Sequence, residues 1–176
     1  MSKRIYTIGH STRELYELIA LLKENGVLRL ADIRRFPGSR RYPHFSREAL
    51  SKSLPENGIA YEHFEDLGGR RNPTDDSPNT ALRNGQFRGY ADYMATDEFR
   101  DAVDRLLDSD QTTAYMCAEA VPWRCHRNLL SDELVRRGVE VIHILGPHSR
   151  KNHELSKIAL IRDDRVEYPA AQASFE

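Results

Sequence analysis

Strand-like and helix-like segments alternate along this chain, and that alternation restricts its fold more than any other feature of the sequence. Short apolar runs typical of buried strands are each followed by a longer, less apolar segment, in several cases with helical spacing. The apolar runs cover residues 5–8, 28–33, 59–64, 112–116 and 139–145. Strands separated by helices in this way predict a parallel sheet with helices on both faces. We therefore expect an α/β protein whose five-stranded, mostly parallel sheet has Rossmann-like or flavodoxin-like layering.

Capping residues mark where the helices should begin and end. Ser11 and Glu14 have capping-box spacing ahead of the first helical stripe, and Gly26 lies where a left-handed C-cap would fall. Ser46 is expected to cap a second helix. Two further helices are expected over the amphipathic stripe at 99–107 and over residues 125–137.

The length of the chain fits one compact domain. A chain of 176 residues can bury one hydrophobic core and leaves little room for a second. We expect a single α/β domain over residues 1–150 and a C-terminal extension over residues 151–176, packed on the domain or partly mobile, with a possible hairpin around 163–164. Residues 66–85 are rich in Gly, Pro, Asn and Asp and predict a long surface loop.

Composition excludes several classes of protein. Lys and Arg total 26 and Asp and Glu total 27, so the net charge is −1. A whole-molecule field that collects nucleic acid or anionic membrane is therefore excluded, although a local basic patch is not. Two cysteines are too few for a disulfide scaffold, and neither a signal peptide nor an apolar run long enough to span a bilayer is apparent. We expect a cytoplasmic protein with no membrane partner.

Polar and reactive residues follow the expected strands. Ligands of open α/β sheets bind at the carboxyl ends of the strands, so these residues should gather at one edge. They are Gly9, His10, Arg34, Arg35, Glu65, Asp66, Gly68, Gly69, Cys117, Glu119, Gly146 and His148. Asp32 lies inside or at the end of the second expected strand. We expect Cys117 to be the nucleophile or redox thiol, with Glu119 or His10 as the acid or base.

Residues 116–127 form the segment with the densest reactive groups. Cys125, His126 and Arg127 are expected at the start of a helix, where backbone N–H groups stabilise a thiolate and attract anions. Arg124 adds positive charge, so a thiolate nucleophile at Cys117 would be supported. The alternative is structural: Cys117 is simply buried at a strand end and Cys125 packs under the helix.

Metal binding is a further alternative for the same segment. Cys117, Cys125 and His126, with or without His10, offer thiolate and imidazole ligands. The step of eight residues between the cysteines is not the short spacing of structural zinc sites. We therefore predict no cofactor and no metal. A disulfide between the cysteines is conceivable and would be transient or redox-sensing in a cytosolic protein.

The segment 34–47 is a second constellation, rich in arginine and aromatic residues. Its arginines are Arg34, Arg35, Arg40, Arg41 and Arg47, and its aromatic residues include Phe36, Tyr42 and Phe45. Arginine binds phosphate through two hydrogen bonds and aromatic rings stack on bases. A nucleic-acid-binding module is therefore an alternative to an enzyme. Asp75 and Asp76, close to the Arg70–Arg71 pair, favour a discrete anion pocket instead.

Several motifs together are typical of one family. They are residues 6–11, Asp32-Ile33-Arg34 with Pro37 and Ser39, Leu67-Gly68-Gly69, residues 87–94, and Cys117-x-Glu119 followed by Pro122 and Cys125-His126-Arg127. Over residues 5 to about 146 the chain resembles the family called domain of unknown function 488. The resemblance implies a small, mostly bacterial and archaeal, cytosolic α/β protein whose motif residues act as one unit. It implies no particular reaction.

These inferences converge on a cysteine-dependent transferase or hydrolase that acts on a nucleotide or another small anionic or phosphorylated molecule. The residues expected to bind this anion or substrate are Arg34, Asp32, Arg124, Cys125, His126, Arg127, Gly68 and Gly69. The sequence gives no oligomeric state.

Overall fold

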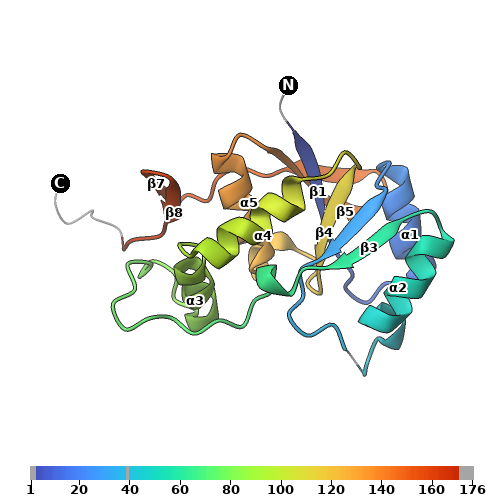
Figure 1. Cartoon of the computed structure of the whole chain (residues 1–176), viewed down its shortest axis with the longest axis horizontal. Coiled ribbons are helices and arrows are strands. Elements are labelled where there is room, and N and C mark those ends of the chain that lie inside the picture. Colours follow the sequence, from blue (N-terminus) through green and yellow to red (C-terminus); the bar gives the residue numbers. More distant parts are fainter. Residues whose placement is uncertain (1–2, 39, 171–176) are drawn as a thin grey trace.

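The strands of the protein build one large sheet and one small one. The computed structural model describes residues 3–38 and 40–170. Six strands form the main sheet in the order β3-β2-β4-β1-β5-β6, and β7 and β8 pair separately (Figure 1). The strands are β1 Arg4–Gly9, β2 Arg29–Asp32, β3 Ala60–His63, β4 Thr113–Cys117, β5 Glu140–Gly146, β6 Ser149–Asn152, β7 Leu160–Arg162 and β8 Arg165–Glu167. The first five strands are parallel, and β6 is antiparallel to β5.

Helices cover both faces of the main sheet. The helices are α1 Leu15–Glu24, α2 Arg47–Glu56, α3 Gly85–Tyr93, α4 Asp97–Leu107 and α5 Arg127–Arg136, with short 3₁₀ helices at Pro43–Phe45, Glu65–Leu67 and Pro122–Arg124. One apolar cluster joins α1 and α2 to one face, and a second joins α3, α4 and α5 to the other. Alternate residues of β4 enter opposite clusters, Met116 the first and Tyr115 the second, as the pleat of a strand requires.

The position of β4 in the strand order determines where a site can form. β4 lies between β2 and β1. The connections after β1 and β2 lead to α1 and α2 on one face, whereas the connection after β4 leads to α5 on the other. Neighbouring strands whose connections leave to opposite faces open a crevice at their carboxyl ends. Cys117, the last residue of β4, therefore lies at such a crevice.

The α/β class, the five parallel strands and the C-terminal hairpin are confirmed. The layering is that of doubly wound proteins, but the strand order is neither the Rossmann nor the flavodoxin order. The antiparallel strand β6 and the helix α3 were not expected. β6 runs across residue 150, where the sequence suggested that the domain ends.

Two expected helix starts are wrong, and two other capping residues are confirmed. Ser11 lies in a left-handed turn with φ 52°, and its N–H donates to Ala118 O at 2.9 Å, so α1 begins later, with Glu14 as its N-cap. The expected helix at 125–137 begins at Arg127, because a 3₁₀ turn and an extended Cys125 precede it. Gly26 has φ 68° and the Ser46 side chain accepts from Ala49 N, as expected.

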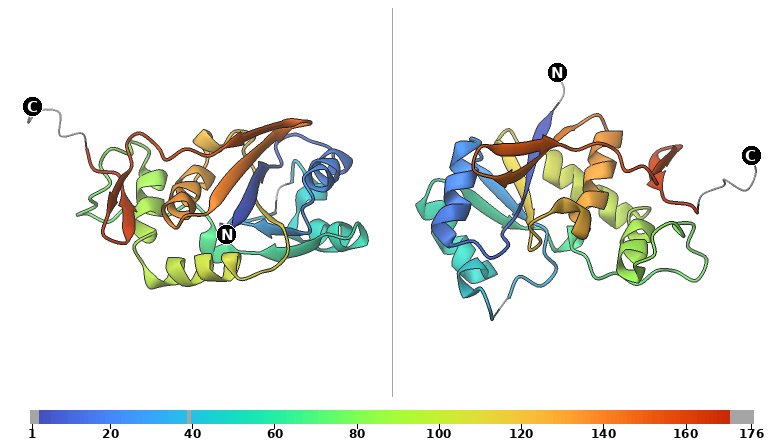
Figure 2. Two further views of the ribbon diagram at one scale, coloured as in Figure 1. Left: turned by 90° about the horizontal axis from the view of Figure 1, so that it is seen from above. Right: turned by 180° about the vertical axis from the view of Figure 1, so that it is seen from behind.

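The long loop expected at residues 66–85 is confirmed over residues 68–84, which contain no helix or strand. Asp92 of α3 fixes this loop by accepting hydrogen bonds from Thr74, Ser77 and Asn79. The hairpin β7–β8 lies at the same end of the molecule as α3, away from α1 and α2 (Figures 1 and 2). Tyr168, just after the hairpin, is fully buried and its carbonyl oxygen accepts from Ala81 N. Within the described residues, no helix has the length and apolar character to cross a membrane.

Candidate functional site

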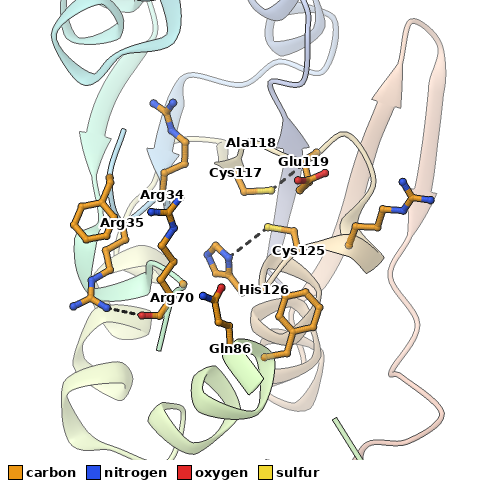
Figure 3. Close-up of a pocket in the computed structure, with 13 residues that line it drawn as sticks. Arg34, Arg35, Arg70, Gln86, Cys117, Ala118, Glu119, Cys125 and His126 are labelled. Carbon is orange, nitrogen blue, oxygen red and sulfur yellow. Dashed lines mark hydrogen bonds between the residues drawn. The ribbon is translucent and has the colours of Figure 1, made fainter. Parts of the chain in front are cut away.

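A pocket of about 240 Å³ opens at the carboxyl ends of β2 and β4 (Figure 3). Its walls come from the loops after these strands, from the long loop, from α3 and from the segment before α5. The lining residues are Arg34, Arg35, Phe36, Gly69, Arg70, Gln86, Phe87, Cys117, Ala118, Glu119, Arg124, Cys125 and His126. Many of the residues expected at a site therefore share one cavity.

Cys117 and Cys125 lie together in this pocket. Both side chains point into the pocket (Figure 3), and the Cys125 thiol is among the groups that change the acidity of Cys117. Both residues are free cysteines and both are buried. Cys117 is held by the register of β4 against β1, where it pairs with Gly9, and by its carbonyl oxygen, which accepts from His10 N at 3.0 Å.

The surroundings of the two thiols separate their acidities. Burial raises the pKa of Cys117, but the hydrogen bond from Cys125 and the charge of Arg127 outweigh it, so the pKa lies below its ordinary value. The hydrogen bond to Cys117 and burial raise the pKa of Cys125 well above its ordinary value. Of the two thiols, Cys117 therefore loses its proton more readily than Cys125.

His126 contacts the Cys125 thiol with a nitrogen that carries no proton. Its Nε2 donates to Ile33 O at 3.2 Å, so Nδ1, 3.4 Å from Cys125 Sγ, is the acceptor. Burial lowers the pKa of His126 to about 4, so the imidazole is neutral at pH 7. The Cys125 thiol can thus donate its proton to His126.

Arg127 does not line the pocket; it is fully buried behind the Cys117–Glu119 turn. Its guanidinium donates to Glu119 O at 3.0 Å, to Ala120 O at 3.3 Å and to Thr7 Oγ1 at 2.9 Å. The Cys117 thiol lies 3.7 Å from the same Glu119 oxygen. Arg127 therefore positions the turn and supplies charge near Cys117 without direct access to a ligand.

Asp32 and Arg34 form a buried ion pair at the pocket wall. Arg34 Nε donates to Asp32 Oδ1 at 2.8 Å and Nη2 donates to Oδ2 at 2.7 Å. Nη2 also donates to Phe45 O, and Nη1 lies 3.4 Å from His10 Nε2. Asp32 is inaccessible, and little of the Arg34 guanidinium remains free for a ligand.

His10 lines a neighbouring hollow rather than the cysteine pocket. This hollow of about 580 Å³ shares Arg34, Phe36, Arg70, Ala118 and Glu119 with it. His10 Nδ1 donates to Ser11 O at 2.9 Å, and burial lowers the pKa of His10 to about 4. His10 is therefore neutral, and its imidazole lines this hollow while its backbone N–H contacts the Cys117 carbonyl oxygen.

An exposed aromatic ring stands at the mouth of the pocket. The Phe36 ring is 62% exposed, and the guanidinium groups of Arg35 and Arg70 each lie 5.5 Å from its centre. Arg35 also donates to Arg70 O at 2.9 Å, which ties the loop after β2 to the long loop. Within the described part of the chain, no ion pair occupies Arg35, Arg70 or Arg124.

Gly68 and Gly69 allow the long loop to pack closely against Arg35 and His126. A Cβ on Gly69 would lie 2.9 Å from His126 Nδ1, and one on Gly68 would lie 2.6 Å from Arg35 Cβ. Larger residues would push the long loop away from His126 and Arg35. Gly69 lines the pocket and Gly68 does not.

Helix α3 supplies two pocket residues that the sequence reading missed, Gln86 and Phe87. The Asn84 side chain accepts from the backbone N–H groups of both, which is a normal N-cap. Asn84 was therefore the residue in the sequence that could have predicted the start of α3. Gly85 and Gly89 argued against a helix there, because glycine disfavours helices.

The cysteines and His126 do not make a ligand set for a metal. Residues 3–38 and 40–170 contain no group of three or more His, Cys, Asp or Glu side chains that could hold a metal ion. His10, the other ligand considered, lines the neighbouring hollow.

Comparison with known proteins gives one finding. Residues 13–134 match the model of the family described as "Domain of unknown function DUF488". No curated protein matches the chain significantly, and neither does any solved structure. The match includes both cysteines and ends before β5, so it is shorter than the range over which the sequence motifs resemble the family.

Proposed function

This chain belongs to the DUF488 family, and we propose that it is a cysteine-dependent enzyme that transfers a group from a small anionic substrate. Cys117 is the nucleophile. Glu119 and Cys125 exchange protons with the substrate, and the arginines at the pocket mouth bind its negative charge.

One observation carries this proposal. Arg127 is a fully buried cation, and among the described residues no carboxylate lies within ion-pair distance of it. A buried charge is costly unless an opposite charge or strong hydrogen bonds compensate it. The nearby thiol of Cys117, whose pKa is lowered partly by Arg127, can supply that opposite charge as a thiolate. A purely structural cysteine would not need this environment.

The chemistry follows from the protons that the two thiols hold. The Cys117 thiolate attacks an electrophilic carbon or phosphorus, a bond from Cys117 Sγ to that atom forms, and the bond to the leaving group breaks. The leaving group takes the proton from Cys125. Glu119, whose side chain lines the same pocket, then passes a proton from the attacking water or second substrate back to Cys125. Transfer of the bound group to water or to a second substrate then regenerates the thiolate.

The pocket mouth supports a nucleotide as the substrate. Arg35, Arg70 and Arg124 can contact phosphate, and the exposed ring of Phe36 can stack on a base. Aliphatic anions would use only the arginines. The substrate class is therefore an anion with a flat ring.

Alkylation tests this function. We expect iodoacetamide to label Cys117 at neutral pH, the Cys117→Ser variant to lose that label, and AMP to slow the labelling. Peptide mass spectrometry distinguishes Cys117 from Cys125, and circular dichroism verifies the fold of the variant. Absence of labelling at Cys117 across the pH range in which a thiolate forms would refute the nucleophile.

A nucleic-acid-binding module is the second candidate. The exposed Phe36 and the cation–π contact between Arg41 and Tyr42 at 5.6 Å support it, because both rings lie in the arginine-rich segment. Binding of single-stranded RNA or DNA should then weaken steeply with salt. No binding at low salt would end this candidate.

A further inference from the structure

A chain of buried hydrogen bonds runs from Arg127 through the sheet to a distant carboxylate. Arg127 Nη1 lies 2.9 Å from Thr7 Oγ1, which lies 2.6 Å from His143 Nδ1. His143 Nε2 lies 2.9 Å from His153 Nδ1, and His153 Nε2 lies 2.7 Å from Asp132 Oδ1. All of these side chains are at most 5% exposed.

One arrangement of protons satisfies every link in this chain. Arg127 can only donate, so it donates to the Thr7 hydroxyl, and Thr7 donates to His143 Nδ1. His143 then donates through Nε2 to His153, and His153 donates through Nε2 to the Asp132 carboxylate. His143 is neutral in this arrangement. Burial, with the nearby charges, lowers the pKa of His143 to about 3, in agreement.

The two ends of the chain carry opposite charges. Asp132 is 0% exposed and also accepts from Tyr168 OH at 2.7 Å and from Ser156 N at 3.0 Å. Arg127 has a buried Nε without a hydrogen-bond partner in the described residues. Thr7 and the two histidines thus join a buried cation to a buried anion that is too far away to pair with it directly.

We infer that Thr7, His143, His153 and Asp132 are positioning residues, which orient the Arg127 guanidinium beside the Cys117 thiol. This inference rests on the proposed function of Cys117. The oriented dipoles of the chain stabilise the positive charge of Arg127, as partners behind a functional group commonly do. They also hold Nη2 on the carbonyl oxygens that shape the Glu119–Ala120 turn.

The other groups that face Cys117 do not replace this effect. Cys125 comes from the segment before α5, Glu119 from the turn after β4, and Tyr115 from β4 itself. Of these and Arg127, only Arg127 is a cation. Loss of its orientation should therefore change the acidity of Cys117.

Three of the side chains that complete the chain of hydrogen bonds come from the part beyond the family match. His143 lies in β5, His153 follows β6 and Tyr168 follows β8, whereas the match ends at residue 134. A hollow of about 400 Å³ lined by His143 and His153 lies on this side of the protein. The C-terminal segment therefore contributes to the cysteine site without lining it.

Isosteric substitution of Thr7 tests the inference. Thr7→Val keeps the shape and removes the hydroxyl link, whereas Thr7→Ser keeps the hydroxyl. The readout is the rate at which iodoacetamide alkylates Cys117, followed as a function of pH in the full-length protein. We expect the thiol pKa of Cys117 to rise by about one unit in Thr7→Val and to return close to the wild-type value in Thr7→Ser.

A double-variant comparison separates positioning from mere stability. Asp132→Asn should raise the Cys117 pKa on its own and should add little in the Thr7→Val background, because both act through one chain. An unchanged Cys117 pKa in folded Thr7→Val overturns the inference. If Thr7→Val does not fold, His153→Phe replaces it, because His153 lies in the same series of hydrogen bonds and lines the hollow. The Cys117 pKa should rise in this variant as well, and an unchanged pKa in the folded variant overturns the inference. Failure of the proposed function can be distinguished from failure of this inference, because Cys117 would then be unreactive in the wild-type protein itself.

Discussion

Asp32 holds Arg34 through two parallel hydrogen bonds, at 2.8 and 2.7 Å, inside the wall of the candidate site. The Arg34 backbone N–H donates to Asp32 Oδ1 at 3.1 Å, and Tyr61 OH donates to Asp32 Oδ2 at 2.6 Å. The pair explains why an arginine that looks available for anions in the sequence is only 7% exposed. Its first role is to fix the loop after β2, on which Arg35 and Phe36 stand.

Removal of one partner should be strongly destabilising. Arg34→Met leaves a buried carboxylate without its cation, so we expect the free energy of unfolding to fall by about 3–5 kcal/mol. Urea denaturation monitored by circular dichroism measures the change. The double variant Asp32→Asn with Arg34→Met should recover part of the loss, because no charge remains buried. A loss below about 1 kcal/mol, as for exposed pairs, would contradict this reading.

The second thiol should control the acidity of the first. Cys125→Ala removes the hydrogen bond that lowers the pKa of Cys117, so we expect that pKa to rise. Cys125→Ser is the matched control, because its hydroxyl can still donate and the pKa should stay lower than in Cys125→Ala. The ultraviolet absorbance of the thiolate, followed against pH, gives both values. Equal pKa values in the two variants would show that the hydrogen bond has no role.

His126 should make the protein sensitive to acid. Its pKa is about 4 in the folded protein against an ordinary 6.5, so the unfolded chain binds its proton first as the pH falls. Stability should therefore be full above pH 6.5 and decline toward pH 4, with a contribution of about 3 kcal/mol from this residue. Urea titrations at several pH values measure the decline, which should be smaller in His126→Gln.

His148 is the control for this acid effect, since its side chain is 90% exposed. His148→Gln should keep the acid sensitivity of the wild-type protein. The same decline in His126→Gln as in the wild type would assign the effect to other groups.

Phe36 should discriminate between ring-bearing and simple anions. Stacking on a base contributes about 1–3 kcal/mol, so Phe36→Leu should weaken AMP binding on the order of tenfold and leave inorganic phosphate binding unchanged. Isothermal titration calorimetry measures both. Trp123→Leu, which changes another exposed aromatic residue outside the cysteine pocket, should alter neither. Equal weakening of both ligands would argue against stacking.

Strand–helix alternation predicted the parallel sheet well because buried parallel strands have a strong apolar signal. β6 had no such signal: all four of its residues are exposed and polar. α3 was hidden by Gly89, which is needed there because a Cβ would lie 2.0 Å from the carbonyl oxygen of Arg71. Such a contact depends on the long loop and has no pattern in the local sequence.

The site was predicted in part for the same reason. The short separation of Cys117 from Cys125 along the chain, with a turn between them, made their proximity foreseeable. The burial of Arg127 was not, because it depends on Thr7, Glu119 and Ala120, which meet only in the folded chain. His143 and His153 lie outside every sequence motif and contact one another only through the pairing of β5 with the chain that follows β6.

The proposed nucleophile and the residues proposed to bind the substrate lie on different kinds of structure. Cys117 ends a central strand with neighbours on both sides, whereas Arg35, Phe36, Arg70 and Arg124 stand outside the main sheet, on loops and a short 3₁₀ helix at its rim. Mutation can therefore remodel the rim with little disturbance to the thiol. Related chains with the same two cysteines could diverge in the molecules they accept while they retain one chemical step, and a substrate found for one of them would not transfer automatically to the next.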